Sequence, residues 1–551
     1  MSHRSDTETD SSDPSWEPVV ADDVPEVHPD APRRPAGRIA PWYVGALSGT
    51  VAAIFAVGVG LASAQMLTTT SPTDAVGGAF VDRVPKWLKN LAIDWFGTSD
   101  KTALKVGMFM VMAALAVVLG WRSLRRPLTG AAGFALFALL GLLCALDRPN
   151  SDGAIVVPPL LAGLAGIAAL LISLRSFDHQ WRRANSPQRS RAPLGWDRRR
   201  FVVASGGFAA AGAALSGTAV ALEQRRVNRL RAAAGASLPP LATDTTTPTV
   251  DDNTGPINPV TPFITPNNDF YRIDTALSFP FIDLDTWRLQ IGGLVERERE
   301  FSFAELLEME QVERTITLCC VSNEVGGDLV GTARWRGVLL ADVLRACGVQ
   351  SSAEQVFSTS ADGWTCGFPV AAAFDGRDAM IALGMNNEGL PLEHGYPARL
   401  VIPGLYGYVS ATKWLTSIRL TTWADDVGYW VPRGWSREAP VKTQSRIDVP
   451  KRGARLDAGT VPVAGVAWAQ GRGIARVEIQ IDDGPWVQAE LGAENLDDAW
   501  RLWRYTWDAT PGDHRITVRA TDGEGVVQTD EVAPPDPDGA TGHHSRRVTV
   551  R

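Results

Sequence analysis

The sequence predicts a chain of several domains: a helical membrane anchor, an α+β domain and a C-terminal β-sandwich resembling an immunoglobulin domain. Three observations support this division. The N-terminal part holds apolar runs long enough to cross a bilayer. The middle mixes short helical and strand patterns. The last part alternates apolar and polar residues between turn signals, as in a β-sandwich.

Changes in composition set the expected boundaries. We expect a disordered cytoplasmic tail at 1–38, a transmembrane region at 39–222, a linker at 223–262, an α+β domain at 263–438 and an immunoglobulin-like domain at 439–551. The tail is rich in charged residues, Ser and Pro, and poor in apolar residues, so it cannot bury enough surface to fold. A length of 551 residues also exceeds that of one compact domain.

Charge and cysteine content exclude several classes of protein. A net charge of -8 argues against a general nucleic-acid binder. The chain has 5 cysteines and no CxxC motif. A disulfide scaffold, a four-cysteine zinc site and a c-type haem are therefore not expected.

About five transmembrane spans are predicted. The segment from Pro41 to Leu67 contains no charged residue, and further apolar runs follow at 103–121, 128–146, 153–174 and 201–222. Residues 84–97 combine helical apolar spacing with Trp and Lys, which favours a helix lying in the membrane interface. No histidine lies in any predicted span, so a haem held by span histidines is not expected.

Positive charges set the orientation. Arginine clusters before the first span, after the second and between the fourth and fifth all fall on one side, which makes that side cytoplasmic. We therefore expect a multi-pass plasma-membrane protein with a cytoplasmic N-terminus and an extracytoplasmic C-terminal half. Before the fifth span, Arg198-Arg199-Arg200-Phe201 resembles a twin-arginine export signal. The alternative is an ordinary span with a positive flank.

Short elements are expected in the C-terminal half. Trp287 to Ile291 is strand-like, Ser302 to Glu305 forms a capping box that opens a helix, and Val338 to Leu344 has a helical pattern. Leu400 to Ile402 reads as a short buried strand. Beyond residue 440, half-buried strands are expected at 461–468, 475–481, 486–491, 500–507, 515–520 and 546–550.

Three clusters in the α+β region contain chemically capable residues. They are 266–274 (PNNDFYRID), 320–327 (CVSNEVGG) and 394–413, which begins with HGYPAR and ends with Thr412 and Lys413. Each has a structural explanation when considered separately. A lone Cys is more often a buried small hydrophobe, and an Arg or Lys is usually solvated.

Together the three clusters resemble the sulfite oxidase family of molybdopterin-dependent oxidoreductases, as a membrane-anchored bacterial member. The resemblance covers about residues 255–551. It implies that 263–438 is the molybdopterin-binding catalytic domain and that the C-terminal domain mediates dimerisation. It also implies a molybdenum–molybdopterin cofactor held by a pterin dithiolene and one Cys thiolate. A soft thiolate suits such a sulfur-rich site.

The resemblance assigns roles to individual residues. Cys320, three residues before Asn323, would bind the metal, and Cys319 would be a packing residue. Arg272 would reach toward the metal as a catalytic residue. The cofactor would be held by Phe270, Tyr271, Arg272, Ile273, Asp274, Asn323, His394, Arg399, Thr412 and Lys413. Asp362 is a further candidate to face the site.

Two departures from the family pattern argue against sulfite as the substrate. The family has an Arg after the Cys-x-x-Asn element, and Glu324 and Val325 occupy that stretch. The family's catalytic Tyr corresponds to Trp435, and an indole cannot ionise as a phenol does. Tyr429 is nearby, on the other side of Trp430.

The sequence thus predicts an extracytoplasmic enzyme that transfers an oxygen atom to or from a small substrate. Its electrons would pass to an external carrier such as a cytochrome or a quinone-linked protein. Two alternatives remain open. One is a hydrolase that uses Cys320 with His394 as its base. The other is a non-catalytic surface protein that binds a partner.

Overall fold

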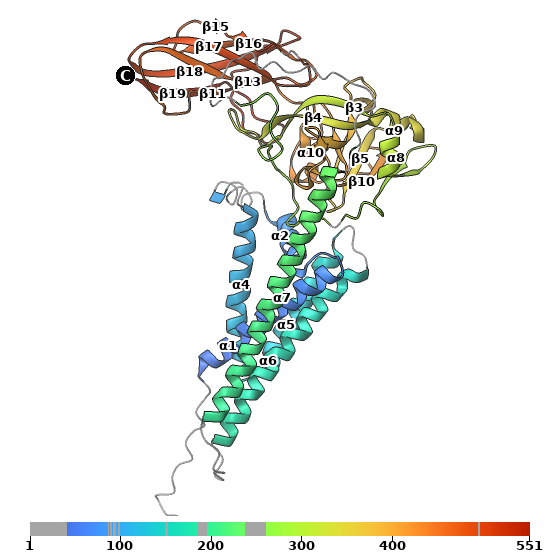
Figure 1. Ribbon diagram of the computed structural model, residues 1–551, viewed down its shortest axis with the longest axis vertical. Helices are drawn as coiled ribbons and strands as arrows, with labels where there is room; N and C mark the ends of the chain where they lie inside the picture. Colours follow the sequence, from blue (N-terminus) through green and yellow to red (C-terminus); the bar gives the residue numbers. More distant parts are fainter. Residues whose placement is uncertain are drawn as a thin grey trace, which may run out of the picture.

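The computed structural model describes residues 41–85, 100–148, 153–184, 195–236, 261–280, 282–493 and 496–551, with single residues between some of these ranges. Long helices form a bundle at one end, the α+β region caps this bundle, and the C-terminal sheets lie farthest from the helices (Figure 1). The predicted tail at 1–38 and most of the predicted interfacial helix at 84–97 lie outside the described residues.

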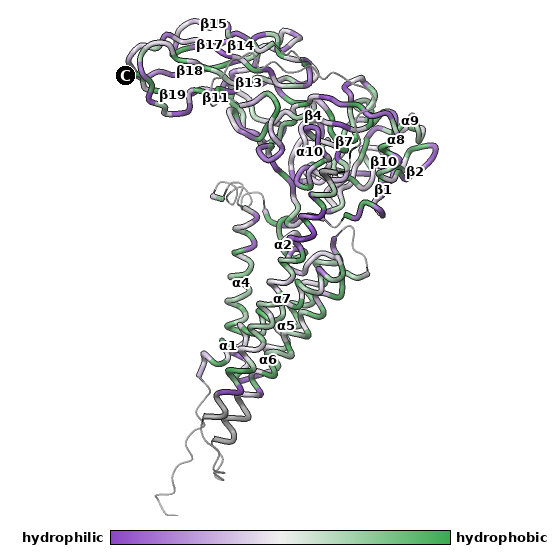
Figure 2. Tube along the Cα trace, in the orientation of Figure 1, coloured by the Kyte–Doolittle hydropathy of each residue, from purple (hydrophilic) through white to green (hydrophobic). Residues whose placement is uncertain are grey.

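The helical part contains five segments, within the described residues, that are long and apolar enough to cross a membrane. They coincide with the five predicted apolar runs, and the bundle is largely hydrophobic along its length (Figure 2). The helices are α1 (Trp42–Met66), α2 (Pro72–Arg83), α4 (Asp100–Ser123), α5 (Pro127–Leu146), α6 (Val157–Ala184) and α7 (Gly195–Ala236), with a 3-10 helix η2 (Gly153–Val156) before α6.

Glycines let α1 approach its neighbours closely. A Cβ added to Gly49 would lie 2.0 Å from the carbonyl oxygen of Ala116 in α4. One added to Gly58 would lie 2.4 Å from the carbonyl oxygen of Gly212 in α7. Small residues at such contacts are typical of helices that pack within a membrane.

Helix α7 is longer than the sequence analysis predicted. It continues through Ala236, so residues 223–236, which we expected to begin the linker, are helical. This segment consists mainly of Ala, Leu, Arg, Glu and Gln, which favour helix strongly, and its charges do not interrupt it. Its end contacts the α+β region, where Arg231 forms an ion pair with Glu393.

The α+β region is built on one mixed sheet, in which β1 and β10 are parallel, and one antiparallel sheet. One has the strand order β2-β1-β10-β5-β6, and the other β3-β4-β7-β8, with β9 paired to β7. The strands are β1 (Arg288–Gly293), β2 (Arg299–Ser302), β3 (Val312–Cys319), β4 (Val330–Leu339), β5 (Gln355–Ser360), β6 (Thr365–Pro369), β7 (Met380–Met385), β8 (Glu388–Gly389), β9 (Arg399–Val401) and β10 (Leu415–Thr421). The helices are α8 (Phe303–Glu308), α9 (Leu340–Cys347), α10 (Gly407–Ser410), η3 (Val370–Ala373), η4 (Leu392–His394) and η5 (Val431–Arg433).

Several predicted elements of this region are confirmed. The Ser302 hydroxyl accepts a hydrogen bond from the Glu305 backbone, and the Glu305 carboxylate accepts one from the Ser302 backbone. This capping box opens α8. Helix α9 begins at Leu340 rather than at Val338, because Val338 and Leu339 still belong to β4.

The C-terminal region consists of two sheets that share one core. Their strand orders are β11-β13-β17-β16 and β12-β19-β18-β14-β15. The strands are β11 (Gln444–Val449), β12 (Arg455–Leu456), β13 (Gly459–Trp468), β14 (Ile474–Ile481), β15 (Val487–Gln488), β16 (Glu490–Leu491), β17 (Arg501–Ala509), β18 (Gly512–Asp522) and β19 (His544–Val550). Val463 and Trp503 of one sheet and Val477 and Ile516 of the other belong to the same buried cluster. The region is therefore rich in β-structure, as predicted, and its immunoglobulin-like topology remains a prediction.

Candidate active site

A cavity of about 120 Å³ lies in the α+β region, where the three sequence clusters meet. Cys320 reaches it from the end of β3, and Arg399 from the start of β9. Its wall consists of Phe270, Tyr271, Ile273, Asp274, Thr275, Cys320, Ser360, Asp362, Trp364, Arg399, Gly407, Tyr408, Ala411, Lys413, Trp414 and Trp430. The cavity thus joins a thiol, two cations and several aromatic rings.

Cys320 is held by a closed loop. Its backbone N–H donates to the Leu329 carbonyl at 2.9 Å, and its own carbonyl accepts from the Asn323 N–H at 3.0 Å. The Asn323 side-chain oxygen accepts a hydrogen bond from the Leu329 N–H at 2.8 Å, which ties the two ends of the loop together. Asn323 therefore positions Cys320 through the backbone.

The two adjacent cysteines have different surroundings. Cys319 belongs to a buried apolar cluster, as predicted for a packing residue. The Cys320 side chain instead lines the cavity. Burial raises the pKa of the Cys320 thiol, while hydrogen bonds from Ser322 and the charge of Lys413 act in the opposite direction. A thiol in such a site becomes a strong ligand once a metal displaces its proton.

An aromatic wall lies beside the thiol. Phe270 stacks on Tyr271 with ring centroids 5.1 Å apart, and its edge contacts Trp335 and His394. The His394 Nε2 atom is 2.8 Å from the Asn267 carbonyl oxygen. Burial lowers the pKa of His394 to about 4, so its ring is neutral near pH 7. The His394 ring thus contacts Asn267 and Phe270. Among the hydrogen bonds of the described residues, none joins His394 to Cys320.

Arg399 brings a buried positive charge to the cavity. Its guanidinium lies 4.9 Å from the Trp335 ring centroid and donates to the His394 carbonyl at 3.1 Å. No carboxylate lies within ion-pair distance of it in the part of the chain that the structure describes. Burial lowers the pKa of Arg399 to about 10. A buried cation without a counter-charge is costly, so this position favours an anionic ligand.

Asp274 collects three cations at the edge of the cavity. Its carboxylate pairs with Lys413 at 3.3 Å, Arg272 at 2.9 Å and Lys101 at 2.6 Å. Burial by itself would raise the pKa of Asp274, but Lys413, Lys101 and Arg272 hold it well below its usual range. Burial lowers the pKa of Lys413 to about 8, although Asp274 acts to raise it.

Four predicted site residues do not line the cavity: Asn323 and His394, described above, and Arg272 and Thr412. The Thr412 hydroxyl is buried and lies 2.7 Å from the Ser358 hydroxyl. Arg272 is half-exposed, pairs with Asp274 and lies over the Phe279 ring at 4.6 Å. Its guanidinium is therefore engaged outside the cavity wall, and its predicted reach toward a metal stays a prediction.

Sequence reasoning missed several residues at the site. Tyr408 lines the cavity, and its hydroxyl donates to the Ser436 carbonyl at 2.7 Å. Tyr408 lies inside the third cluster, four residues before Thr412, and this position could have indicated that it belongs to the site. Lys101 begins a predicted membrane helix, and nothing in the sequence connects it with Asp274. Trp435 packs on Tyr408 with centroids 5.7 Å apart, whereas the Tyr429 hydroxyl donates to Asp82 at 2.7 Å.

The residues present fit a large anionic cofactor that carries its own metal. The cavity offers one thiol, and Arg399 lacks a carboxylate partner among the described residues. The side-chain nitrogen Nδ2 of Asn323 and the ring nitrogen Nδ1 of His394 are buried and make no hydrogen bond. Neither residue lines the cavity itself, so contact of these two atoms with a bound ligand is a prediction. Fold and site together define a molybdopterin-binding oxidoreductase.

Comparison with known proteins identifies the family. Residues 276–430 match the family model described as "Oxidoreductase molybdopterin binding domain". Sulfite oxidase of Gallus gallus is 30% identical over 322 residues, which cover 49% of this chain and 69% of that protein. Mitochondrial sulfite oxidase of Homo sapiens is 29% identical over 321 residues, which cover 49% of this chain and 58% of that protein. The chain belongs to the sulfite oxidase family of molybdopterin-dependent oxidoreductases, and family membership implies a molybdenum–pterin cofactor.

Among solved structures, the sulfane dehydrogenase SoxCD from Paracoccus pantotrophus is similar, with a TM-score of 0.46 and 24% identity. The match covers 53% of this chain and 84% of that one. The chain spans less than two thirds of the length of human sulfite oxidase.

Proposed function

We propose that the chain is an extracytoplasmic, membrane-anchored oxidoreductase that transfers an oxygen atom to or from a small substrate. The observation that carries this proposal is the buried Cys320 thiol in a cavity wall beside Arg399, a cation that has no carboxylate partner among the described residues. A soft thiolate suits a sulfur-rich metal site, and an unpaired buried cation suits the negative charge of a pterin phosphate.

The chain's own residues would divide the work at this site. Cys320 would bind the metal, and Phe270 and Tyr271 would support the pterin as a flat aromatic wall. Arg399 and Lys413 would neutralise the cofactor's negative charge. Asn323 and His394 would donate or accept hydrogen bonds through the nitrogen atoms that are otherwise unused. The cofactor, when bound, supplies two-electron redox chemistry at molybdenum.

Sulfite is a poor candidate for the substrate. The positions that would carry a sulfite-binding Arg hold Glu324 and Val325, and Glu324 is exposed. Trp435 stands where a phenol is expected and packs on Tyr408. Tyr408 therefore supplies a phenol to the cavity from a different element. These two departures favour a small substrate other than sulfite.

Membrane anchoring is supported by the five apolar helices of the described residues, and the proposed orientation by the arginine clusters that the sequence puts on one side of them. The proposed topology has a cytoplasmic N-terminus and an extracytoplasmic catalytic domain. The Arg-rich start of α7 supports export by the twin-arginine route. Blocking that route should leave the catalytic domain inside the cell, where protease added to spheroplasts cannot reach it. Unchanged cleavage of the domain would exclude this route.

The catalytic proposal is tested by metal analysis of the purified full chain together with electron paramagnetic resonance. The oxidised protein is titrated with sulfite and the dithionite-reduced protein with candidate S- or N-oxides. One class of oxide should reoxidise the reduced molybdenum, whereas sulfite should give a weak Mo(V) signal or none. Protein that lacks molybdenum, or a Cys320→Ala variant with an unchanged Mo(V) signal, would refute it.

A further inference from the structure

Two further cavities connect the active site with the helix bundle. One, of about 790 Å³, lies where the outer ends of the helices meet the α+β region. The other, of about 620 Å³, lies within the bundle between α1, α2, α4, α5 and α6. We call them the junction cavity and the bundle cavity. Neither belongs to the cofactor site already described.

The junction cavity adjoins the active site. Thr275, Asp362 and Trp364 line both the junction cavity and the active-site cavity. The wall between the two spaces is therefore no thicker than these side chains. Burial raises the pKa of the Asp362 carboxyl, whose oxygen accepts a hydrogen bond from the Trp364 N–H at 3.1 Å.

The junction cavity is polar and offers hydrogen-bond donors. The Tyr429 hydroxyl donates to Asp82 at 2.7 Å, and Arg148 pairs with the same carboxylate at 3.3 Å. Arg433 donates to the Asp82 carbonyl at 3.2 Å. Asp82 ends α2, so these contacts also dock this helix against the α+β region.

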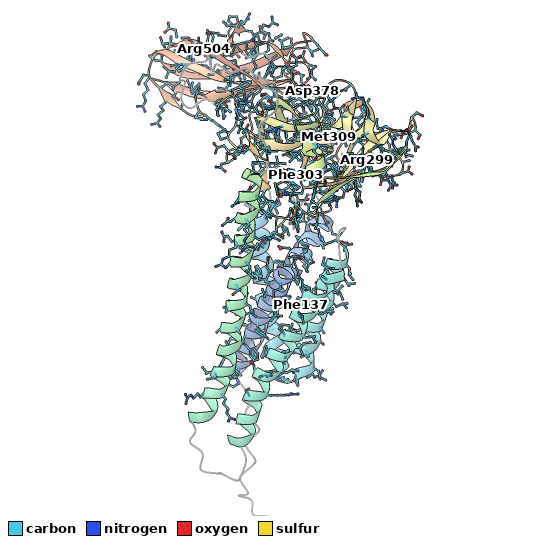
Figure 3. All side chains as sticks on the ribbon, turned by 45° about the vertical axis from the view of Figure 1, so that its right-hand side comes forward. Phe137, Arg299, Phe303, Met309, Asp378 and Arg504 are labelled. Carbon is cyan, nitrogen blue, oxygen red and sulfur yellow. The ribbon has the colours of Figure 1, made fainter. Side chains whose placement is uncertain are left out.

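The bundle cavity is apolar and lies next to the junction cavity along α1. On α1, Leu61 lines the bundle cavity, while Gln65, one turn or about 5.4 Å further on, lines the junction cavity. On α2, Phe80 faces the bundle cavity, and Asp82, on the opposite face of the helix, faces the junction cavity. One space is polar and the other apolar, as are the head and the tail of an amphipathic molecule. Phe137, which lines the bundle cavity from α5, lies part-way down the bundle (Figure 3).

The proposed reaction needs a carrier for two electrons. The five apolar spans contain no histidine that could hold a haem. The residues that the structure describes also contain no group of His, Cys, Asp and Glu that could hold a metal ion. The electrons must therefore leave the chain on an external carrier, and the apolar helices give access to a carrier that is dissolved in the membrane.

We propose that this carrier is a lipid-soluble quinone, with its ring in the junction cavity and its tail in the bundle cavity. The two ring oxygens would accept hydrogen bonds from arginine N–H groups of the junction cavity, of which the buried Arg148 Nε–H makes no hydrogen bond among the described residues. In the oxidative direction, the substrate and one water give the oxygenated product, two electrons and two protons. The quinone takes up the two electrons and the two protons to become a quinol. The reverse direction uses a quinol with the same balance. Asp362, on the shared wall, is placed to pass one of the protons.

This inference rests on the proposed function, and its test separates the two. Full-length protein in detergent is reduced with dithionite, freed of excess reductant and mixed with decyl-benzoquinone or with ferricyanide, a water-soluble acceptor. Mo(V) resonance and quinol absorbance follow the reaction. We expect one quinol per molybdenum and a rate that saturates with the quinone concentration.

A pair of matched variants tests the bundle cavity. Gly107 lines it, and a Cβ added there meets no atom within 4 Å, so Gly107→Phe directs its ring into open space beside the helix. Gly207, on the exposed side of α7, is equally free of contacts and lines neither cavity, so Gly207→Phe is the control. Displacing the tail by a few methylenes should raise the half-saturating concentration of decyl-benzoquinone by roughly tenfold in Gly107→Phe. Gly207→Phe should be unchanged.

Each outcome of these experiments bears on one of the two proposals. Reoxidation by ferricyanide but not by decyl-benzoquinone overturns the quinone inference and leaves the proposed function standing. The same half-saturating concentration of decyl-benzoquinone in both variants also overturns the quinone inference, whether or not Gly107→Phe has lost bound phospholipid. A tailless benzoquinone should show no difference between the variants. Protein that cannot be reduced by dithionite or reoxidised by ferricyanide refutes the proposed function, and the inference with it.

Discussion

Lys101, in the first turn of the apolar helix α4, donates a hydrogen bond of 2.6 Å to the Asp274 carboxylate at the edge of the active-site cavity. The same carboxylate pairs with Lys413 of the cavity wall. The helix bundle thus contributes a charge to the catalytic site, which is more than an anchor requires. A soluble catalytic domain without α4 would leave Asp274 with fewer partners.

This relationship predicts that Asp274 supports both the site and the docking of the bundle. Asp274→Asn leaves buried Lys413 without its counter-charge, and breaking a buried pair typically costs about 3–5 kcal/mol. We expect a large loss of unfolding free energy in denaturant titrations, together with loss of bound molybdenum. Asp342→Asn is the control, because its pair with Arg345 is exposed and should contribute less than about 1 kcal/mol. Equal stability of the two variants would contradict the role of Asp274.

Asn323 is predicted to position Cys320 without binding substrate. Asn323→Ala removes the hydrogen bond to the Leu329 N–H and leaves that loop donor unpaired, at a cost of about 1–3 kcal/mol. We expect a lower molybdenum content and a broadened Mo(V) spectrum in the residual holoenzyme. The neighbouring exposed Glu324, changed to Gln, should leave both unchanged. A normal spectrum in Asn323→Ala would show that the loop holds Cys320 by other means.

Arg399 is predicted to matter more to the cofactor than to the fold. In cofactor-free protein, Arg399→Met removes a buried charge without a carboxylate partner, so stability should stay within about 1 kcal/mol of wild type or rise. The same variant should retain little cofactor during purification. Arg314→Met, which affects a part-exposed pair with Asp378, should retain it. A strongly destabilised cofactor-free Arg399→Met protein would instead assign Arg399 a purely structural role.

Much of this site could be predicted from the sequence. Cys320, Phe270, Tyr271, Arg399 and Lys413 all belong to recognisable clusters, because short motifs keep chemical groups at fixed spacing. Their spacing along the chain was enough to predict that they share one cavity, once the family resemblance linked the clusters.

The remaining features depend on tertiary contacts. Lys101 follows the pattern of an interfacial anchor, and only the docking of α4 brings it to Asp274. The guanidinium of Arg272 pairs with that same carboxylate, which no spacing rule indicates. Strand β11 was missed because its buried residues include the polar Gln444, Ser445, Arg446 and Asp448, so it shows neither the alternation of a half-buried strand nor the apolar run of a buried one.

Acid is predicted to weaken the C-terminal region through His544. The His544 Nδ1 atom accepts a hydrogen bond from the Ile447 N–H at 2.9 Å, which requires a neutral ring. Burial lowers the pKa of His544 to about 4, below the unfolded value of about 6.5. The unfolded chain then binds more protons, so stability is lost as the pH falls from about 6.5 to about 4.

Two variants check the sign of this dependence. His544→Gln keeps an acceptor for Ile447 and should flatten the loss of unfolding midpoint below pH 6.5. His514→Gln is the control, because Asp482 raises the pKa of His514 and its contribution is lost as the pH rises instead. An unchanged acid slope in His544→Gln would contradict the assignment.

We expect Cys320 to bind the molybdenum of a pterin cofactor, and the number of molybdenum atoms per protein chain tests this role. Molybdenum per protein should be measured by mass spectrometry for wild type, Cys320→Ala and Cys319→Ala purified side by side. We expect near-stoichiometric molybdenum in wild type and in Cys319→Ala, because the Cys319 side chain lies in an apolar cluster. Cys320→Ala should lose most of its molybdenum. Molybdenum retained in Cys320→Ala with a wild-type Mo(V) spectrum, or lost equally from both variants, would contradict it.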